Sequence, residues 1–175
     1  IALANRAGYP KVELADLGLA ALFHDMGKAN IPLEVLNKPG EFTEDEWTMM
    51  RNHPTEGVLS LTQLRGITNL PSRMVAASFE HHMNLDYSGY PKLKTPWKLS
   101  LTGRILMIAD CYDAMTSSRV YRREPISPSK VLSIMFSKSG KSFDPTLLKL
   151  FVICVGIVPI GSLVMLDTDE LAVVL

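Results

Sequence analysis

The sequence predicts an all-α fold, a bundle of helices that ends in a small C-terminal β-hairpin. Apolar residues recur at steps of three and four along most of the chain, and capping residues, prolines and glycines mark where these patterns begin and end. Only the last segment changes to the alternating pattern of strands. At 175 residues the chain can bury one complete hydrophobic core, so we expect residues 1–175 to form a single domain.

The first predicted helix covers residues 12–26 and stops at Gly27. Its spaced apolar residues are Val12, Ala15, Leu19, Leu22 and Met26. Residues 30–42 contain two prolines and a glycine and are therefore predicted to be a loop. Thr43 begins the next helix, because a glutamate three residues later completes a capping box, and we expect this helix to run to His53.

Proline and glycine mark the next boundaries. Pro54 is expected to begin or kink a helix. Another helix follows Pro71 and closes at His81 and His82. Residues 86–97 are rich in Gly, Pro, Lys and Tyr and are predicted to form an irregular surface loop.

The second half of the chain predicts three helices and the hairpin. A long helix is expected over residues 99–117. Pro128 and Pro145 each follow a helix-capping residue and therefore stand at the first position of two further helices. Residues 162–166 and 170–175 flank a polar turn and form the predicted hairpin.

The composition excludes several classes of partner. Eighteen basic and eighteen acidic residues cancel, so no overall field attracts long nucleic acid. Glycines and a proline interrupt the apolar residues 150–166, whereas a membrane span needs about 20 continuous apolar residues, so we expect no membrane contact by this domain. Cys111 and Cys154 lie in apolar stretches, which predicts buried thiols and a cytoplasmic location. Because Ile1 is not a natural start, we expect a truncated beginning and an absent upstream regulatory or sensory domain, which could tether the full protein to a membrane.

The histidines form three short clusters instead of scattering. They are His24, His53, His81 and His82. Each has an ordinary alternative: a histidine before a proline is typical of a surface or capping residue, and adjacent histidines on a helix diverge by about 100° unless the helix ends there. Imidazole and carboxylate together, however, are the ligands of catalytic iron, manganese and zinc. The clustering therefore favours a metallohydrolase.

Two aspartates complete the predicted site. Asp25 could be an ordinary polar residue at a helix end, but an acid there opposes the helix dipole, and its two oxygens can bridge two metal ions. Asp110 stands among apolar neighbours, where a carboxylate is costly unless it is paired or bound to a cation. Two ions held in this way can lower the pKa of a water molecule and hold a phosphoryl group in line, which predicts cleavage of a phosphodiester.

Several strings of residues carry a resemblance to a known family. They are His24-Asp25-Met26-Gly27-Lys28, Asn52-His53-Pro54, His81-His82 with Gly89-Tyr90-Pro91, and Ile108-Ala109-Asp110 through Asp113-Ala114-Met115-Thr116. In this order they resemble the signatures of the HD-GYP domain, a branch of the HD-domain metal-dependent phosphohydrolases, and the similarity covers essentially the whole chain.

The resemblance implies an HD-domain helical bundle with a centre of two or three divalent ions, usually iron, with manganese as an alternative. It implies hydrolysis of cyclic di-GMP to pGpG or GMP in bacterial second-messenger signalling. The residues that match the family's metal ligands are His24, Asp25, His53, His81, His82 and Asp110.

The resemblance also implies roles in catalysis and substrate binding. Lys28 matches the catalytic-site lysine and would act together with Asp25. Arg119 and Arg122 match a basic pair that resembles a guanine and phosphate clamp, although they could equally be a solvated run at a helix end. The loop Gly89-Tyr90-Pro91 would support the substrate site and dock partners such as diguanylate cyclase domains, while its composition alone favours a rigid turn. A homodimer is left open.

Three departures from the family pattern stand out. Met83 replaces a glutamate that usually follows the paired histidines, and Tyr87 replaces a glycine, which would be strained if that position needs a positive φ. No histidine precedes His24, where the family has a further ligand. These departures leave open a catalytically degenerate domain that binds a cyclic dinucleotide or a partner protein without turnover. A nucleotidase acting on mononucleotides fits the Gly-Tyr-Pro loop and the arginine pair less well.

Overall fold

The computed structural model describes residues 1–64, 72–118 and 124–175, so Arg119 and Arg122 lie outside the described residues. The helices are α1 Ala2–Arg6, α2 Lys11–Phe23, the 3-10 helix η1 Met26–Asn30, α3 Leu33–Leu36, α4 Glu44–Thr62, α5 Ser72–Glu80, α6 Leu101–Thr116, α7 Pro128–Ser137 and α8 Pro145–Val155. The antiparallel strands β1 Leu163–Met165 and β2 Leu171–Val173 form the expected hairpin. The predicted fold class is confirmed.

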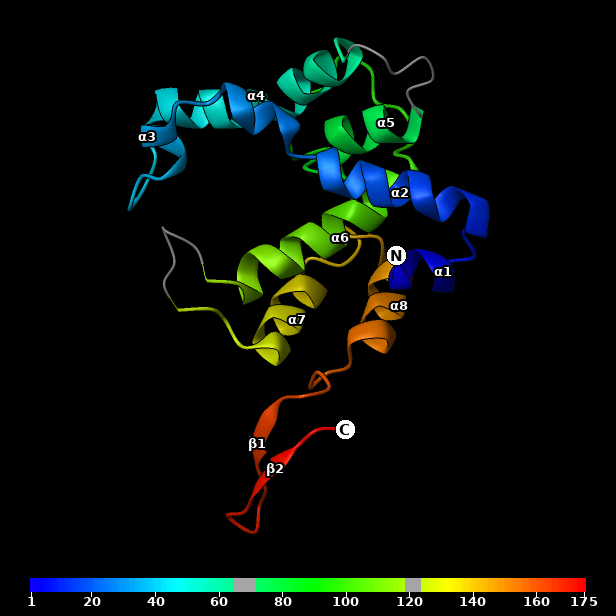
Figure 1. Cartoon of the computed structure of the whole chain (residues 1–175), viewed down its shortest axis with the longest axis vertical. Helices are drawn as coiled ribbons and strands as arrows, with labels where there is room; N and C mark the ends of the chain where they lie inside the picture. The colour runs from blue at the N-terminus through cyan, green and yellow to red at the C-terminus, as the bar shows by residue number, and fades with distance from the viewer. Residues whose placement is uncertain (65–71, 119–123) are drawn as a thin grey trace.

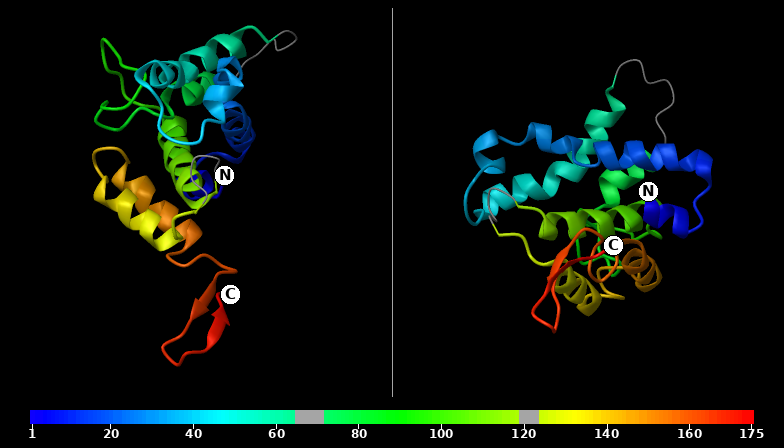
Figure 2. Two further views of the ribbon diagram at one scale, coloured as in Figure 1. Left: turned by 90° about the vertical axis from the view of Figure 1, so that its left-hand side faces the viewer. Right: turned by 60° about the horizontal axis from the view of Figure 1, so that its bottom comes forward.

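The helices lie in two groups on either side of α6 (Figure 1). Helices α2 to α5 lie on one side, α1, α7 and α8 lie on the other, and the hairpin stands apart from the helical body (Figure 2). Within the described residues, no helix is both long enough and apolar enough to cross a bilayer.

Helix α6 joins two buried clusters of apolar side chains. Ile105 and Ile108 pack in the larger cluster with residues of α1, α7 and α8. Leu106 packs in the smaller cluster, which includes Leu61 of α4 and Ala77 of α5. Because side chains of α6 pack in both clusters, the two clusters together fix the position of Asp110, which lies near the middle of this helix.

Local capping chemistry confirms two of the predicted helix starts, whereas Ser127 before α7 makes no side-chain capping hydrogen bond. Thr43 and Glu46 form the reciprocal capping box of α4, with the Thr43 N–H donating to Glu46 Oε2 at 2.6 Å. The Asp144 carboxylate caps α8 by accepting the N–H groups of Thr146 and Leu147 at 2.9 and 3.1 Å. The same carboxylate pairs with Arg104 of α6.

The structure corrects several predicted boundaries. Helix α2 ends at Phe23, and the chain continues through η1 instead of stopping at Gly27. The predicted loop contains the short helix α3. Pro54 does not begin a helix but lies inside the continuous α4, and a kink at this residue stays a prediction. Helix α2 packs against α5 and η1 packs against α4, which a local pattern does not reveal.

Candidate metal centre

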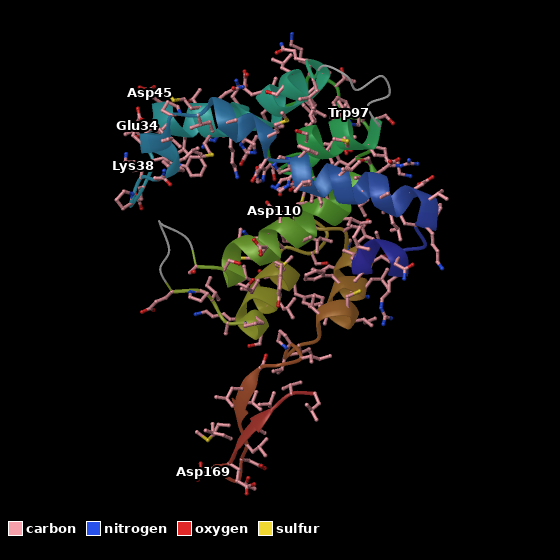
Figure 3. All side chains as sticks on the ribbon, viewed as in Figure 1. Glu34, Lys38, Asp45, Trp97, Asp110 and Asp169 are labelled. Carbon is pink, nitrogen blue, oxygen red and sulfur yellow. The ribbon has the colours of Figure 1, made fainter. Side chains whose placement is uncertain are left out.

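Four separate parts of the fold bring together the six predicted ligands. His24 and Asp25 follow the end of α2, and His53 lies in the middle of α4. His81 and His82 follow the end of α5. The sixth, Asp110, is contributed by α6 and is labelled in Figure 3 close to α2.

Asp25 lies at the centre of this group. Its Oδ1 atom is 3.3 Å from His53 Nε2 and 3.6 Å from His81 Nε2. Its Oδ2 atom is 3.4 Å from His24 Nε2 and 2.6 Å from the Lys28 ammonium. The two oxygens of one carboxylate therefore face different sets of nitrogen atoms, as a bridging ligand would.

The ligand atoms form two adjoining sets that share Asp25. The potential ligand atoms of one set lie within 4.8 Å of one another and belong to Asp25, His53, His81 and His82. On the other side, His24 Nε2 lies 3.7 Å from Asp110 Oδ1. This cluster could hold a metal ion, and its mixture of imidazole and carboxylate suits a divalent first-row metal.

Backbone carbonyl groups orient three of the imidazoles. The Nδ1 atoms of His24, His53 and His81 lie 2.6, 2.6 and 2.9 Å from the carbonyl oxygens of Ala21, Met50 and Ser78. A carbonyl only accepts, so Nδ1 carries the hydrogen, and in a neutral ring the lone pair is at Nε2. All three Nε2 atoms face the cluster, which is the arrangement that metal-binding histidines adopt.

The contact between His53 and His81 also fits a cation. Their Nε2 atoms are 3.1 Å apart, and with hydrogen at both Nδ1 atoms two lone pairs face each other. Close by, His24 Nε2 and Asp25 Oδ1 are buried and have no hydrogen-bond partner among the described residues. Unpartnered buried polar atoms are costly, and cations bound in the two sets of ligand atoms would satisfy them.

The electrostatics of the site show the same demand for positive charge. Although burial favours the neutral imidazole, the Asp110 and Asp25 carboxylates raise the pKa of His24 to about 10. Burial opposes ionisation of Asp25 as well, but contacts with His24, His53 and His81 and the charge of Lys28 hold the pKa of Asp25 well below its usual range. Although burial opposes it, contact with His24 lowers the pKa of Asp110 too, so both carboxylates remain anionic ligands at neutral pH.

A cavity of about 750 Å³ opens from the cluster. His53, His82 and Asp110 line its inner end, together with Lys28. Residues 40–50 contribute the outer wall, where the rings of Phe42 and Trp47 meet edge to face at 5.3 Å. The volume is in the range of small-molecule sites, and the aromatic rings give it an apolar surface.

The Gly-Tyr-Pro loop packs directly on His82. A Cβ atom at Gly89 would lie 2.1 Å from the His82 carbonyl oxygen, so only glycine fits there. The Tyr90 N–H donates to that carbonyl at 3.1 Å, and the rings of Tyr90 and His82 are 4.7 Å apart. Of these three loop residues only Tyr90 lines the cavity, and Pro91 borders a separate hollow of about 480 Å³. Burial, with the charges of Asp25 and Asp110, raises the pKa of Tyr90 above its usual value.

The two departures that the structure describes lie beside this loop. Tyr87 has a φ of 62°, the left-handed conformation that favours glycine, so the predicted condition for strain is met. Its hydroxyl donates to the Trp97 carbonyl at 2.8 Å, a contact that glycine could not make. Met83 is 1% exposed and packs as a buried apolar residue.

Two supporting residues were not predicted from the sequence. Glu80, directly before the histidine pair, is 4% exposed and accepts hydrogen bonds from Trp97 Nε1 and the Ser100 N–H, both at 2.9 Å (Trp97 is labelled in Figure 3). This ties the end of α5 to the start of α6. Ser78 is fully buried and donates to the His24 carbonyl at 3.2 Å. Glu80 carried the same signal as Asp110, an acid in an apolar helix, whereas nothing in the sequence distinguishes Ser78.

Comparisons with known proteins show which family the chain resembles. The family model described as HD domain matches residues 2–147. The chain is 37% identical over 175 residues to the cyclic di-GMP phosphodiesterase PA4108 of Pseudomonas aeruginosa, covering 100% of this chain and 41% of that protein. It is 37% identical over 145 residues to the cyclic di-GMP phosphodiesterase response regulator RpfG of Xanthomonas campestris, covering 82% and 37%. It is 31% identical over 150 residues to the 3'3'-cGAMP-specific phosphodiesterase 2 of Vibrio cholerae, covering 86% and 28%. The chain thus spans less than half the length of each of these curated relatives.

Proposed function

We propose that this chain, which belongs to the HD domain family and to its HD-GYP branch, hydrolyses cyclic di-GMP at a centre of at least two divalent metal ions. One observation carries the proposal. The two oxygens of Asp25 face separate sets of ligand atoms, and His53, His82 and Asp110 of these sets line a cavity large enough for a nucleotide.

The donor set suits iron or manganese, and the six residues that would hold the ions are His24, Asp25, His53, His81, His82 and Asp110. When bound, the ions would supply the positive charge that polarises a phosphodiester and activates water. Lys28 lines the cavity with its ammonium against Asp25, where it can stabilise negative charge that develops on the phosphate oxygens. Phe42 and Trp47 offer surfaces on which a base can stack. Arg119 and Arg122, outside the described residues, stay a proposed clamp.

A second candidate substrate is 3'3'-cGAMP, because three relatives with 31–37% identity are named as specific for it. The two cyclic dinucleotides differ in one base, so the metal centre alone does not separate them. The degenerate alternative receives less support, since all six candidate ligands are present and converge. For the same reason we propose that the domain hydrolyses its substrate, with pGpG or GMP as the product.

The outer side of the Gly-Tyr-Pro loop is a proposed contact for partner proteins such as diguanylate cyclase domains. Pro91 and Lys92 border the hollow of about 480 Å³ between this loop and α4, and a surface hollow beside the catalytic loop would let a partner influence the site. Loss of binding in a Lys92→Glu variant, with unchanged turnover, would support this contact. A homodimer and a cytoplasmic location also remain proposals.

The test is turnover by protein purified without oxygen and reconstituted with Fe²⁺ or Mn²⁺. We expect hydrolysis of cyclic di-GMP, with 3'3'-cGAMP and a mononucleotide measured alongside to fix specificity. The His24→Ala and Asp25→Ala variants should lose turnover and bound metal. Asp45→Ala, which removes an exposed acid from the first turn of α4, is the matched control and should retain both. Equal turnover in all four proteins would refute the proposed centre.

A further inference from the structure

Three of the histidines are held by the same kind of hydrogen bond. In His24, His53 and His81 the Nδ1 atom lies 2.6–2.9 Å from the carbonyl oxygen three residues earlier in the chain. Inside an α-helix each carbonyl already accepts the N–H group four residues later. The contact is therefore best made with a carbonyl that lacks this backbone partner.

His24 and His81 obtain such carbonyls from helix ends. Ala21 lies in the last turn of α2, and Ser78 lies in the last turn of α5. The last four carbonyls of a helix have no N–H partner within the helix. The histidine that follows each helix can therefore fold back and donate to one of them.

His53 has no helix end beside it, because α4 continues on both sides. In a continuous helix the Met50 carbonyl would accept the N–H of residue 54. That residue is Pro54, which has no N–H to donate. The Met50 carbonyl instead lies 2.6 Å from His53 Nδ1. Pro54 thus leaves a carbonyl without a backbone N–H partner in the middle of a helix, as the helix ends do for His24 and His81.

We propose that Pro54 is a positioning residue of the metal centre. By withholding a backbone N–H, it leaves the Met50 carbonyl to fix the His53 tautomer whose Nε2 lone pair faces Asp25 Oδ1 at 3.3 Å and His81 Nε2 at 3.1 Å. The inference rests on the proposed metal centre. It explains why a residue that normally breaks helices is fully buried inside α4, next to a ligand.

The experiment compares variants that separate the missing N–H from the proline ring. Pro54→Ala restores the N–H. The α-hydroxy analogue of alanine at position 54 has the same small side chain but an ester oxygen in place of the N–H. Pro145→Ala is the control, because a proline at the first position of α8 withholds no N–H that the helix needs. Each protein is purified free of metal, and two quantities are measured: the ¹⁵N shifts of the His53 ring, and the Zn²⁺ dissociation constant by chelator competition.

We expect Pro54→Ala to bind Zn²⁺ at least about tenfold more weakly, the usual effect of losing a contact that orients a ligand. Its His53 ring should show a mixture of tautomers, while its thermal unfolding temperature should not fall. The hydroxy analogue and Pro145→Ala should match the parent chain in ring shifts and Zn²⁺ affinity.

Other outcomes would overturn the inference. Unchanged Zn²⁺ binding and ring shifts in Pro54→Ala would show that the N–H is irrelevant. Equal loss in the hydroxy analogue would assign the effect to packing of the ring, as would failure of Pro54→Ala to fold. If the parent chain itself binds no Zn²⁺, the metal centre fails separately, and the ring shifts of the metal-free proteins still decide the role of Pro54.

Discussion

Replacing Gly27 by alanine should disable the site without unfolding the protein. Gly27 lies in η1 against the middle of α4, and an added Cβ atom would be 1.9 Å from the His53 carbonyl oxygen and 2.4 Å from the Gly57 nitrogen. Both are backbone atoms, so neither can turn aside. Since ordinary carbon contacts begin near 3.4 Å, η1 and α4 must move apart by about 1.5 Å.

This movement acts directly on the ligands. Asp25 precedes η1 and His53 lies on α4, and their ligand atoms are now 3.3 Å apart. A misplacement of about 1 Å can cost about 100-fold in rate, so we expect kcat/KM for a phosphodiester to fall at least about 100-fold. Overpacking of this kind lowers the free energy of unfolding by about 1–3 kcal/mol, which a folded domain of this size can tolerate.

The assay measures hydrolysis of bis(p-nitrophenyl) phosphate, bound metal per chain and thermal unfolding. Gly18→Ala is the matched control, because the nearest atom to its added Cβ is a flexible side-chain carbon of Ile1 at 3.8 Å. In the interior of α2 this change should raise the free energy of unfolding by about 0.5–1 kcal/mol and leave turnover unchanged. If Gly27→Ala keeps metal and turnover like the control, close packing of η1 on α4 does not position the ligands and the reasoning is wrong.

Three further changes probe individual contacts. Lys28→Gln should lower kcat by about 100-fold or more with bound metal unchanged, because its ammonium faces the cavity; loss of metal instead would make it a structural partner of Asp25. Glu80→Gln should weaken metal binding more than it lowers the unfolding temperature, since it loosens the turn that carries the histidine pair, and parallel losses would contradict this. Against the effect of partial burial, helix N–H groups and the Arg104 ion pair lower the pKa of Asp144. The ionised carboxylate therefore stabilises the folded protein above its ordinary pKa of 3.8, and this contribution to the free energy of unfolding is lost as the pH falls below that value. Asp144→Asn should therefore unfold more easily by up to about 1 kcal/mol at neutral pH, with the difference vanishing in acid; a constant difference in pH titrations of unfolding would refute the charge effect.

Helix starts were predictable because their chemistry is local. The capping box at Thr43 and the aspartate cap before Pro145 each satisfy backbone N–H groups within four residues. The role of Pro54 was not predictable in this way. A proline breaks an isolated helix because a carbonyl loses its partner, but here the side chain of His53 takes the place of that partner, and the ring is buried by neighbouring elements.

The buried face of α2 could not be read from its spacing. Val12, Leu19 and Leu22, part of the stripe that indicated the helix, are 83%, 43% and 73% exposed. The core side chains of this helix are Leu17 and Ala20 instead. Apolar residues surround most of α2, so several stripes satisfy the same period and only the tertiary packing selects one.

The ligands were identifiable by type, but their convergence depends on contacts between distant parts of the chain. Ser78 of α5 donates to the carbonyl of His24, 54 residues earlier, and Gly57 of α4 allows this approach, since a Cβ there would lie 2.5 Å from the serine oxygen. Asp110 is held on α6, whose side chains belong to both apolar clusters. The site therefore lies at the junction of the two cores. Its geometry is a consequence of how they pack together, which residue spacing along the chain does not encode.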